Sequence, residues 1–255
     1  ITAFAFLAPL LSPHDMEAND WELIQAAPTL AQSHWFGTDA NGRDLFVRVA
    51  AGARVSLAIG LITTLVSVVI GVLYGAIAGY VGGRVDQAMM RVVDVLYALP
   101  LFFAIIILVT VFGRNIFLVF LAIGAVEWLT IARIVRGQTL AAKQMEYVEA
   151  ARSLGAPASR IVLRHIVPNV VGPVIVFSTL LVPTVILVES FLSFLGLGVQ
   201  EPQTSWGLLI SQGTASLDSA PWLLVIPAAF LAATMFAFNF IGDGLRDALD
   251  PRDET

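Results

Sequence analysis

The chain has 255 residues, of which 58% are hydrophobic and only 13% are charged. Soluble domains carry about 25% charged residues, so this composition excludes an ordinary soluble protein and indicates a single-domain, polytopic membrane protein. The formal net charge of −5 argues against a nucleic-acid partner, and the absence of cysteine excludes disulfides, thiolate metal sites and covalent haem.

The first apolar run, Ile1 to Leu11, is too short to cross a bilayer, which takes about 20 apolar residues. We interpret it as the outer end of a first transmembrane helix whose start precedes Ile1. A cleaved signal peptide is the alternative, but the run has neither a cationic start nor a small-residue cleavage site.

Residues 12–54 are polar and lean acidic, with turn-forming Pro and Gly, and we expect an extracytoplasmic loop. His34 begins its most distinctive run, HWFGTDANGRD. No second histidine stands at metal-ligand spacing from His34, and the three histidines are scattered, so the sequence predicts no metal site.

The first complete span is predicted over Val55 to Ala78, where 24 uncharged residues follow one another. Gly71, Gly75 and Gly79 form two overlapping GxxxG units, a pattern that lets another helix approach closely. That helix belongs either to this chain or to a second subunit.

A short turn at residues 82–84 and the third span, Val95 to Phe112, come next. Pro100 should break or kink this span. Arg84 and Arg91 indicate the cytosolic side, and we expect Asp94 to lie at the interface, paired with Arg91.

The fourth span, Ile116 to Ala132, contains Glu127. An ionisable residue at that depth faces the protein interior or water. Glu127 therefore either lines a translocation path or forms a hydrogen bond to a neighbouring helix.

A basic segment follows, because six of the fourteen Lys and Arg residues lie between Arg133 and Arg164. Positive residues concentrate in cytosolic loops, so residues 137–169 are predicted to be cytosolic. Gly155 suits the left-handed position that ends a helix and Pro157 the first turn of the next, with Pro168 restarting the chain toward the following span. Two short helices and a turn are expected.

The surface of this loop has two candidate uses. Met145, Val148, Ala151 and Leu154 recur at helical spacing and predict one apolar face. Arg160 and Arg164 stand four residues apart on the second helix, where like charges repel by roughly 0.2–0.5 kcal/mol. They either reach lipid phosphates or enter a polar or acidic groove of another protein.

The fifth span, Val170 to Val188, ends at Glu189, and the sixth is predicted over Trp222 to Ile241. Residues 190–221 contain no Lys or Arg, which is typical of an extracytoplasmic loop. Trp206 in this loop suits a membrane interface or a docked partner, as does Trp222, and we expect the interface. Residues 242–255 form the expected cytosolic tail. Six spans, the first truncated, place both termini inside, in agreement with the basic central loop.

Four motifs carry a resemblance to a known family. Glu149-Ala150-Ala151, followed by Gly155 and Pro168, resembles the EAA loop of ABC-importer permeases. The runs GTDxxGRD, SFLGLG and GDGLRDxLDP are similar to the dipeptide, oligopeptide and nickel branch, and the chain is closest to its C-type oligopeptide permeases. The resemblance implies an all-α, type I importer permease fold over residues 1–255. It also implies ATPase coupling through Glu149, Ala150, Ala151, Gly155, Arg160, Arg164, His165 and Pro168.

The resemblance implies partners as well. They are a homologous second permease, two cytosolic ATPase subunits and an extracytoplasmic peptide-binding protein, assembled in the lipid of a bacterial inner membrane. The chain itself has one lysine, Lys143, outside any phosphate-loop motif, and lacks HExxH and GxSxG. We therefore predict no catalytic residue and no cofactor in this chain, with ATP and Mg²⁺ bound by the partner ATPases.

Other functions remain open from the residues alone. Within the family the cargo is an oligopeptide or, alternatively, a dipeptide, nickel, an opine or glutathione. A self-sufficient channel or secondary transporter would need several buried charges, and only Glu127 is deep. A membrane enzyme would need a catalytic constellation that the sequence does not show.

Overall fold

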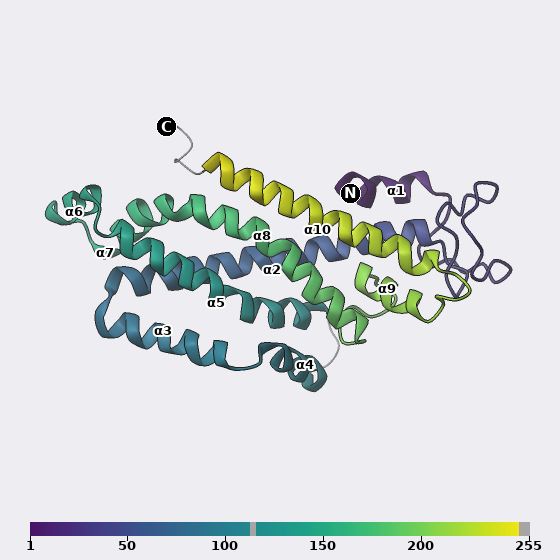
Figure 1. The fold of residues 1–255 in the computed structure, drawn as a ribbon, viewed down its shortest axis with the longest axis horizontal. Helices are drawn as coiled ribbons and strands as arrows, with labels where there is room; N and C mark the ends of the chain where they lie inside the picture. Colours follow the sequence, from purple (N-terminus) through teal and green to yellow (C-terminus); the bar gives the residue numbers. More distant parts are fainter. Residues whose placement is uncertain (113–115, 250–255) are drawn as a thin grey trace. The chain divides into compact units, whose positions relative to one another are not determined.

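The structure is a computed structural model and describes residues 1–112 and 116–249. The described residues are almost entirely helical and contain no strand, only one isolated bridge between Thr38 and Asp44. Ten α-helices and one π-helical turn are formed within them: α1 (Thr2–Leu11), α2 (Leu45–Val81), α3 (Gly83–Ala98), α4 (Leu101–Phe112), α5 (Ile116–Ala142), α6 (Glu146–Ser153), α7 (Ala158–Ile161), the π turn η1 (Val162–Ile166), α8 (Val167–Phe194), α9 (Trp206–Thr214) and α10 (Trp222–Leu249) (Figure 1).

By length and composition, three helices of the described part are apolar and long enough to cross a membrane. They are α2, the continuous helix Ala158–Phe194 and α10, and the bent pair α3 and α4 would make a fourth. The expected count of six is therefore not reached by this measure. Helix α5 has 27 residues but carries Glu127 and two arginines along its length, which makes it less apolar.

The chain divides into two compact units, each made of three separate stretches of sequence. Unit 1 comprises Ile1–Leu61, Ile106–Phe120 and Pro183–Phe238, and unit 2 comprises Ile62–Ile105, Leu121–Val182 and Asn239–Thr255. Five of the described helices contribute residues to both units: α2, α4, α5, α8 and α10.

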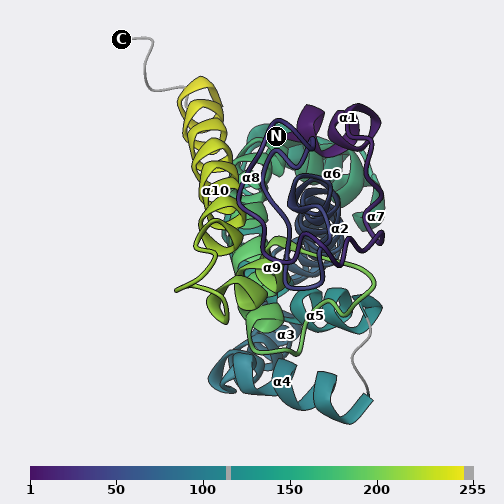
Figure 2. The same ribbon diagram turned by 90° about the vertical axis from the view of Figure 1, so that its right-hand side faces the viewer.

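In unit 1, the irregular segment 12–44 lies around the first turns of α2 and around α9, toward the viewer in Figure 2. Helix α2 begins at Leu45, ten residues before the predicted start of the span, so the predicted loop 12–54 is too long. The Asp44 carboxylate accepts the Val47 N–H at 2.9 Å and caps the helix. The sequence prediction missed these first ten residues of α2 because they include Arg48 and Arg54, and charged residues are more typical of a loop than of a membrane span.

The predicted interface position of Trp206 is wrong. Its side chain is completely buried in unit 1, and the indole N–H donates to the carbonyl of Val49 at 3.2 Å. Trp206 begins α9, a nine-residue helix inside the segment predicted as the 190–221 loop, and Ser205 caps that helix by accepting the Leu208 N–H.

In unit 2, the glycine stripe of α2 packs against α5 of the same chain. A Cβ on Gly71 would lie 2.6 Å from Ile131, one on Gly75 would lie 2.4 Å from the Ala132 carbonyl, and one on Gly79 would lie 2.8 Å from Thr139. Atoms do not approach so closely, so only glycine permits this helix pair. The structure decides between the two alternatives in favour of packing within the chain.

The predicted break near Pro100 is confirmed, because α3 ends at Ala98 and the two helical parts meet at an angle of 81°. The segment after Gly83 differs from the prediction, since it forms the 16-residue helix α3 rather than a turn leading directly into a span. Asp94 on this helix pairs with Arg133 at 2.9 Å and not with Arg91.

Pro168 does not restart the chain. Helix α7, the π turn and α8 form one continuous helix of 37 residues. Proline lacks an N–H and its ring clashes with the carbonyl four residues earlier. The wider π turn, Val162–Ile166, directly precedes Pro168 and gives the ring room, so the helix continues through it.

Candidate functional site

The Glu146–Asn169 loop has the predicted first helix and turn, but its second helix is not short, because α7 continues through the π turn into α8. Helix α6 ends at Ser153 and Gly155 adopts a φ of +78°, the left-handed conformation expected at that position. The Ala156 N–H donates to the Ala151 carbonyl at 3.1 Å and the Gly155 N–H to the Arg152 carbonyl at 3.0 Å. This pair of hydrogen bonds is the Schellman motif, which satisfies the last carbonyls of the helix and sets the direction of the next one.

The loop is packed against the rest of unit 2. Val148 and Ala151 of α6 are buried and share one apolar cluster with Ile161, Ile166 and Ala142. This packing fixes α6 beyond the end of α5 (Figure 1). The loop therefore presents a surface of defined shape.

The predicted coupling residues mostly lie on that exposed surface. Ala151 is buried and His165 is half-buried, whereas the other six are exposed: Glu149, Ala150, Gly155, Arg160, Arg164 and Pro168. The backbone carbonyl of His165 accepts a hydrogen bond from the side-chain amide of Asn169, four residues later on the same helix, at 2.6 Å. The six exposed residues are accessible to a partner.

Of the four residues that the spacing predicted on one apolar face, Val148 and Ala151 are buried, whereas Met145 is 51% exposed and Leu154 does not belong to the buried face. Helix α6 stops one residue before it, and its side chain is 88% exposed. Leu163 on the π turn is also exposed, by 59%. Two exposed leucines beside exposed arginines are typical of a surface that another protein covers.

The six basic residues fall into two groups rather than one loop. Three are held within unit 2: Arg133 by Asp94, Arg136 by Asp86 at 2.5 and 2.6 Å, and Lys143 by the Tyr80 carbonyl at 2.5 Å. The other three, Arg152, Arg160 and Arg164, form no ion pair with any described residue. Only the second group is available for a partner.

Glu127 is half-buried on α5 and makes no hydrogen bond or ion pair within the described part of the chain. The hydrogen-bonded alternative predicted for this residue therefore has no support from a neighbouring side chain of this subunit. A free carboxylate at this position suits water, cargo or a second subunit.

A different carboxylate, Glu189, is fully buried and was predicted only as the end of the fifth span. Its Oε1 accepts the Ser193 hydroxyl at 2.6 Å, and its Oε2 accepts the Ser56 hydroxyl at 3.4 Å. The same two hydroxyl oxygens accept backbone N–H groups, Ser193 from Val199 and Ser56 from Trp206. Glu189 thereby links the residues that flank α9 to helix α2, within unit 1. The serines of the SFLGLG and SWG runs were the signal in the sequence from which this buried, hydrogen-bonded carboxylate could have been predicted.

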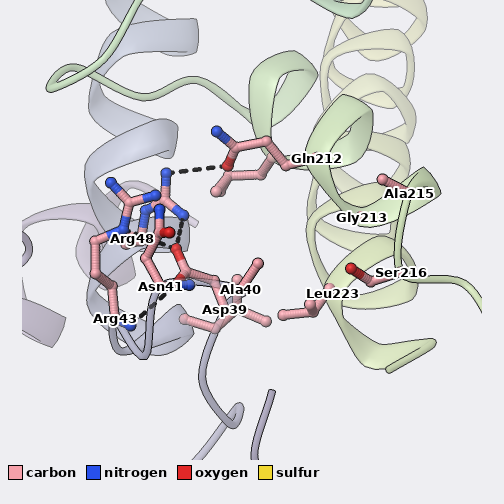
Figure 3. A pocket seen from close by; sticks show the side chains of 12 residues that line it. Asp39, Ala40, Asn41, Arg43, Arg48, Gln212, Gly213, Ala215, Ser216 and Leu223 are labelled. Atoms are coloured by element: carbon pink, nitrogen blue, oxygen red, sulfur yellow. Dashed lines mark hydrogen bonds and ion pairs between the residues drawn. The ribbon is translucent and has the colours of Figure 1, made fainter. Parts of the chain in front are cut away.

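A second polar cluster of unit 1 contains two arginines and two carboxylates, of which Figure 3 shows Arg43, Arg48 and Asp39. Arg48 is 2% exposed and donates to Asp39 and, at 3.1 Å, to the Gln212 amide oxygen. Arg43 donates to Asp39 and to Glu201, both at 2.8 Å. The hydrogen bond from Arg43 lowers the pKa of Glu201 below its ordinary value.

This cluster borders a cavity of about 250 Å³ lined also by Ser216 and Leu223 (Figure 3). The Asp39 carboxylate already accepts the N–H groups of Asn41 and Arg43 as well as both guanidiniums. Its acceptor capacity is used within the chain, so the cluster holds the GTDxxGRD segment in place.

His34 has a neighbour that its sequence spacing did not indicate. The rings of His14 and His34 stack with centroids 4.0 Å apart, and ligand atoms of both histidines and Asp44 lie within 4.8 Å of one another. Both Asp44 oxygens are already in use, since Oδ2 accepts His34 Nδ1 at 2.8 Å and Oδ1 accepts the Val47 N–H. His34 and Asp44 secure the start of α2 by these bonds, and His14 contributes its stacking on His34.

Comparison with known proteins decides the family. The family described as "Binding-protein-dependent transport system inner membrane component" matches residues 71–253. The chain belongs to this family. It is thus a component of the inner membrane, as the sequence predicted.

Individual relatives agree with this result. The oligopeptide transport system permease protein OppC of Escherichia coli K12 is 58% identical over 99% of this chain and 84% of its own length. The dipeptide transport system permease protein DppC of Bacillus subtilis is 45% identical over 97% of this chain and 77% of its own length. An inward-facing structure of the MetNI methionine ABC transporter has the same fold, with a TM-score of 0.62 and 17% identity over 80% of this chain and 96% of that one.

Proposed function

We propose that the chain is a permease subunit of an ATP-driven importer of oligopeptides, coupled to cytosolic ATPases through residues Glu149–Pro168. The observation that carries the cargo is the 58% identity to an oligopeptide permease, compared with 45% to a dipeptide permease and 45% to a glutathione permease. Cargo selectivity itself is assigned to the extracytoplasmic peptide-binding protein and the cavity formed with a second permease.

The coupling role rests on the shape and charge of the loop. Its apolar side is buried against unit 2, while Glu149, three unpaired arginines and two leucines remain exposed. Such a surface fits a groove that is apolar at its centre and acidic at its rim. The ATPase subunits would supply that groove, together with the ATP and Mg²⁺ that this chain has no motif to bind.

Gly155→Val tests the coupling. No atom lies within 4 Å of a Cβ at Gly155, so the cost comes from the φ of +78°, which strains a side chain by about 1–2 kcal/mol. The strain redirects α7, and we expect loss of cargo-stimulated ATP hydrolysis and of ATPase pull-down by the reconstituted complex. Gly137→Val is the matched control, because its Cβ also meets open space but no positive φ is involved.

Glu149→Lys tests the same surface by charge reversal. The side chain is exposed, so folding should be unchanged while ATPase association and stimulation fall. Glu22→Lys makes the same charge change in the predicted extracytoplasmic loop and should leave ATPase pull-down intact. Full stimulation and uptake by both loop variants would show that Glu149–Pro168 is not the coupling element.

The proposed topology has six spans, with residues 137–169 in the cytosol and residues 190–221 outside. Because the chain has no cysteine, single introduced cysteines report sidedness directly. Asp218 and Ser159 are both exposed, so an impermeant thiol reagent outside intact cells should label Asp218→Cys and spare Ser159→Cys. The opposite labelling pattern would invert the topology.

A further inference from the structure

A cavity of about 490 Å³ lies between α3 and α5 of unit 2. Four of its lining residues come from one face of α3 and two from α5: Gln87, Met90, Arg91, Asp94, Arg133 and Arg136. Spacings of three, four and seven residues place the α3 residues on one side of that helix. Neither the coupling loop nor the polar clusters of unit 1 contribute to it.

The cavity has one positive charge in excess. Asp86 neutralises Arg136 through two hydrogen bonds, and Asp94 neutralises Arg133, whose guanidinium also lies 4.3 Å from the centre of the Tyr97 ring. Arg91 is exposed and pairs with no described carboxylate. The uncompensated charge is therefore that of Arg91, beside two arginines that keep further N–H donors.

The position of the cavity matches the headgroup region of a bilayer. Arg133 and Arg136 precede the end of α5 at Ala142 by nine and six residues, about 14 and 9 Å of helix. On α3, Val95 stands four residues after Arg91, next to the cavity, and is 57% exposed. A phosphate in the cavity and an acyl chain along Val95 would satisfy both the charge and this apolar surface.

We propose that this cavity binds the headgroup of an anionic phospholipid, with Arg91 as the principal charge that selects it. The proposal rests on the cytosolic placement of this end of α5 in the proposed function. A free phosphate ion shares the charge chemistry but makes no use of the exposed Val95, so the lipid is the occupant that fits the whole site.

The test is native mass spectrometry of the full chain in detergent, titrated with phosphatidylglycerol or with phosphatidylcholine. We expect the chain to retain phosphatidylglycerol in preference, and Arg91→Gln to weaken that retention about fivefold, the equivalent of about 1 kcal/mol for one basic residue. Arg84→Gln is the matched control, since Arg84 is exposed on the same helix but does not line the cavity. Equal effects of the two variants, or no lipid preference, would refute the site.

Two further experiments distinguish a bound lipid from a free anion and from a second subunit. Inorganic phosphate at millimolar concentration should not displace the lipid, and full displacement would assign the cavity to a free anion. The titration is repeated on the complex assembled with its second permease, where loss of the lipid would assign the surface to a subunit contact and overturn the proposal. Lipid retention is measured without transport or ATP hydrolysis, so its failure is distinguishable from failure of the importer assignment.

Discussion

The polar cluster of unit 1 and the proposed coupling loop of unit 2 use charge in opposite ways. In the first, Arg48 is buried and each of its partners comes from this chain, up to 164 residues away in sequence. In the second, Arg152, Arg160 and Arg164 are exposed and no described residue pairs with them. Charges that are satisfied internally fix a shape, whereas charges left without partners are available for recognition. Mutations should therefore reduce stability in the first region and assembly in the second.

The largest loss of stability is expected from Arg48→Ala. Removing one partner of a buried ion pair costs roughly 3–5 kcal/mol, because the Asp39 carboxylate loses its most buried counter-charge. Thermal and denaturant unfolding of the purified chain in detergent measures this change. Arg54→Ala, on the same helix but exposed, should have almost no effect, and a similar loss in both variants would contradict the contrast.

Packing without charge provides the next test. Gly75→Ala places a Cβ 2.4 Å from the Ala132 carbonyl, and we expect a loss of about 1–3 kcal/mol in the free energy of unfolding. Gly172→Ala puts the same methyl group into open space within a helix and should stabilise the chain by about 0.5–1 kcal/mol. Effects of the same sign would show that α2 and α5 are less close than described.

Glu127→Gln should leave stability nearly unchanged, as expected for the exposed arginines of unit 2, although Glu127 lies on a predicted span. Because no described side chain bonds to its carboxylate, the free energy of unfolding should change by less than about 0.5 kcal/mol. Peptide uptake by the assembled complex should change if the carboxylate lines the path. A clear loss of stability with unchanged uptake would return Glu127 to the structural group.

The smallest effect concerns the exposed edge of the unit 1 cluster. The pKa of Glu201 is lowered from 4.5, chiefly by its hydrogen bond from Arg43. The stabilising contribution of Glu201 is therefore complete above pH 4.5 and is lost as the pH falls through the lowered pKa. Glu201 is 42% exposed, so the difference between the native chain and Glu201→Gln should be about 1 kcal/mol or less at pH 7. Unfolding between pH 3 and 7 should show that difference disappearing on acidification.

Local features were predictable from the sequence, because their causes lie within a few residues. Gly155 and Pro157 defined the turn of the loop, Pro100 the break between α3 and α4, and the stripe from Gly71 to Gly79 a close helix contact. The periodicity of the sequence could not indicate the partner of that contact.

The unit 1 clusters were not predicted, because their bonds join residues that are distant in sequence. Ser56 and Glu189 are 133 residues apart, and Arg48 and Glu201 are 153 residues apart. A buried arginine also resembles a loop residue until its counter-charges are known, which explains why the start of α2 was placed ten residues late. The exposure of Leu154 followed from the end of α6 at Ser153, a boundary that periodicity does not define.

The π turn before Pro168 has a mechanical consequence. Since α7 and α8 are one helix of 37 residues, about 55 Å long, Arg160 and Arg164 of the proposed docking surface lie on the first turns of a helical rod that continues into a predicted span. A flexible loop at this point would bend when a moving ATPase displaced it. A continuous helix would instead transmit that displacement as tilt or rotation of the whole rod. Two glycines introduced at Val162 and Leu163 would make a joint there. The resulting subunit should still bind its ATPases while hydrolysis no longer drives uptake.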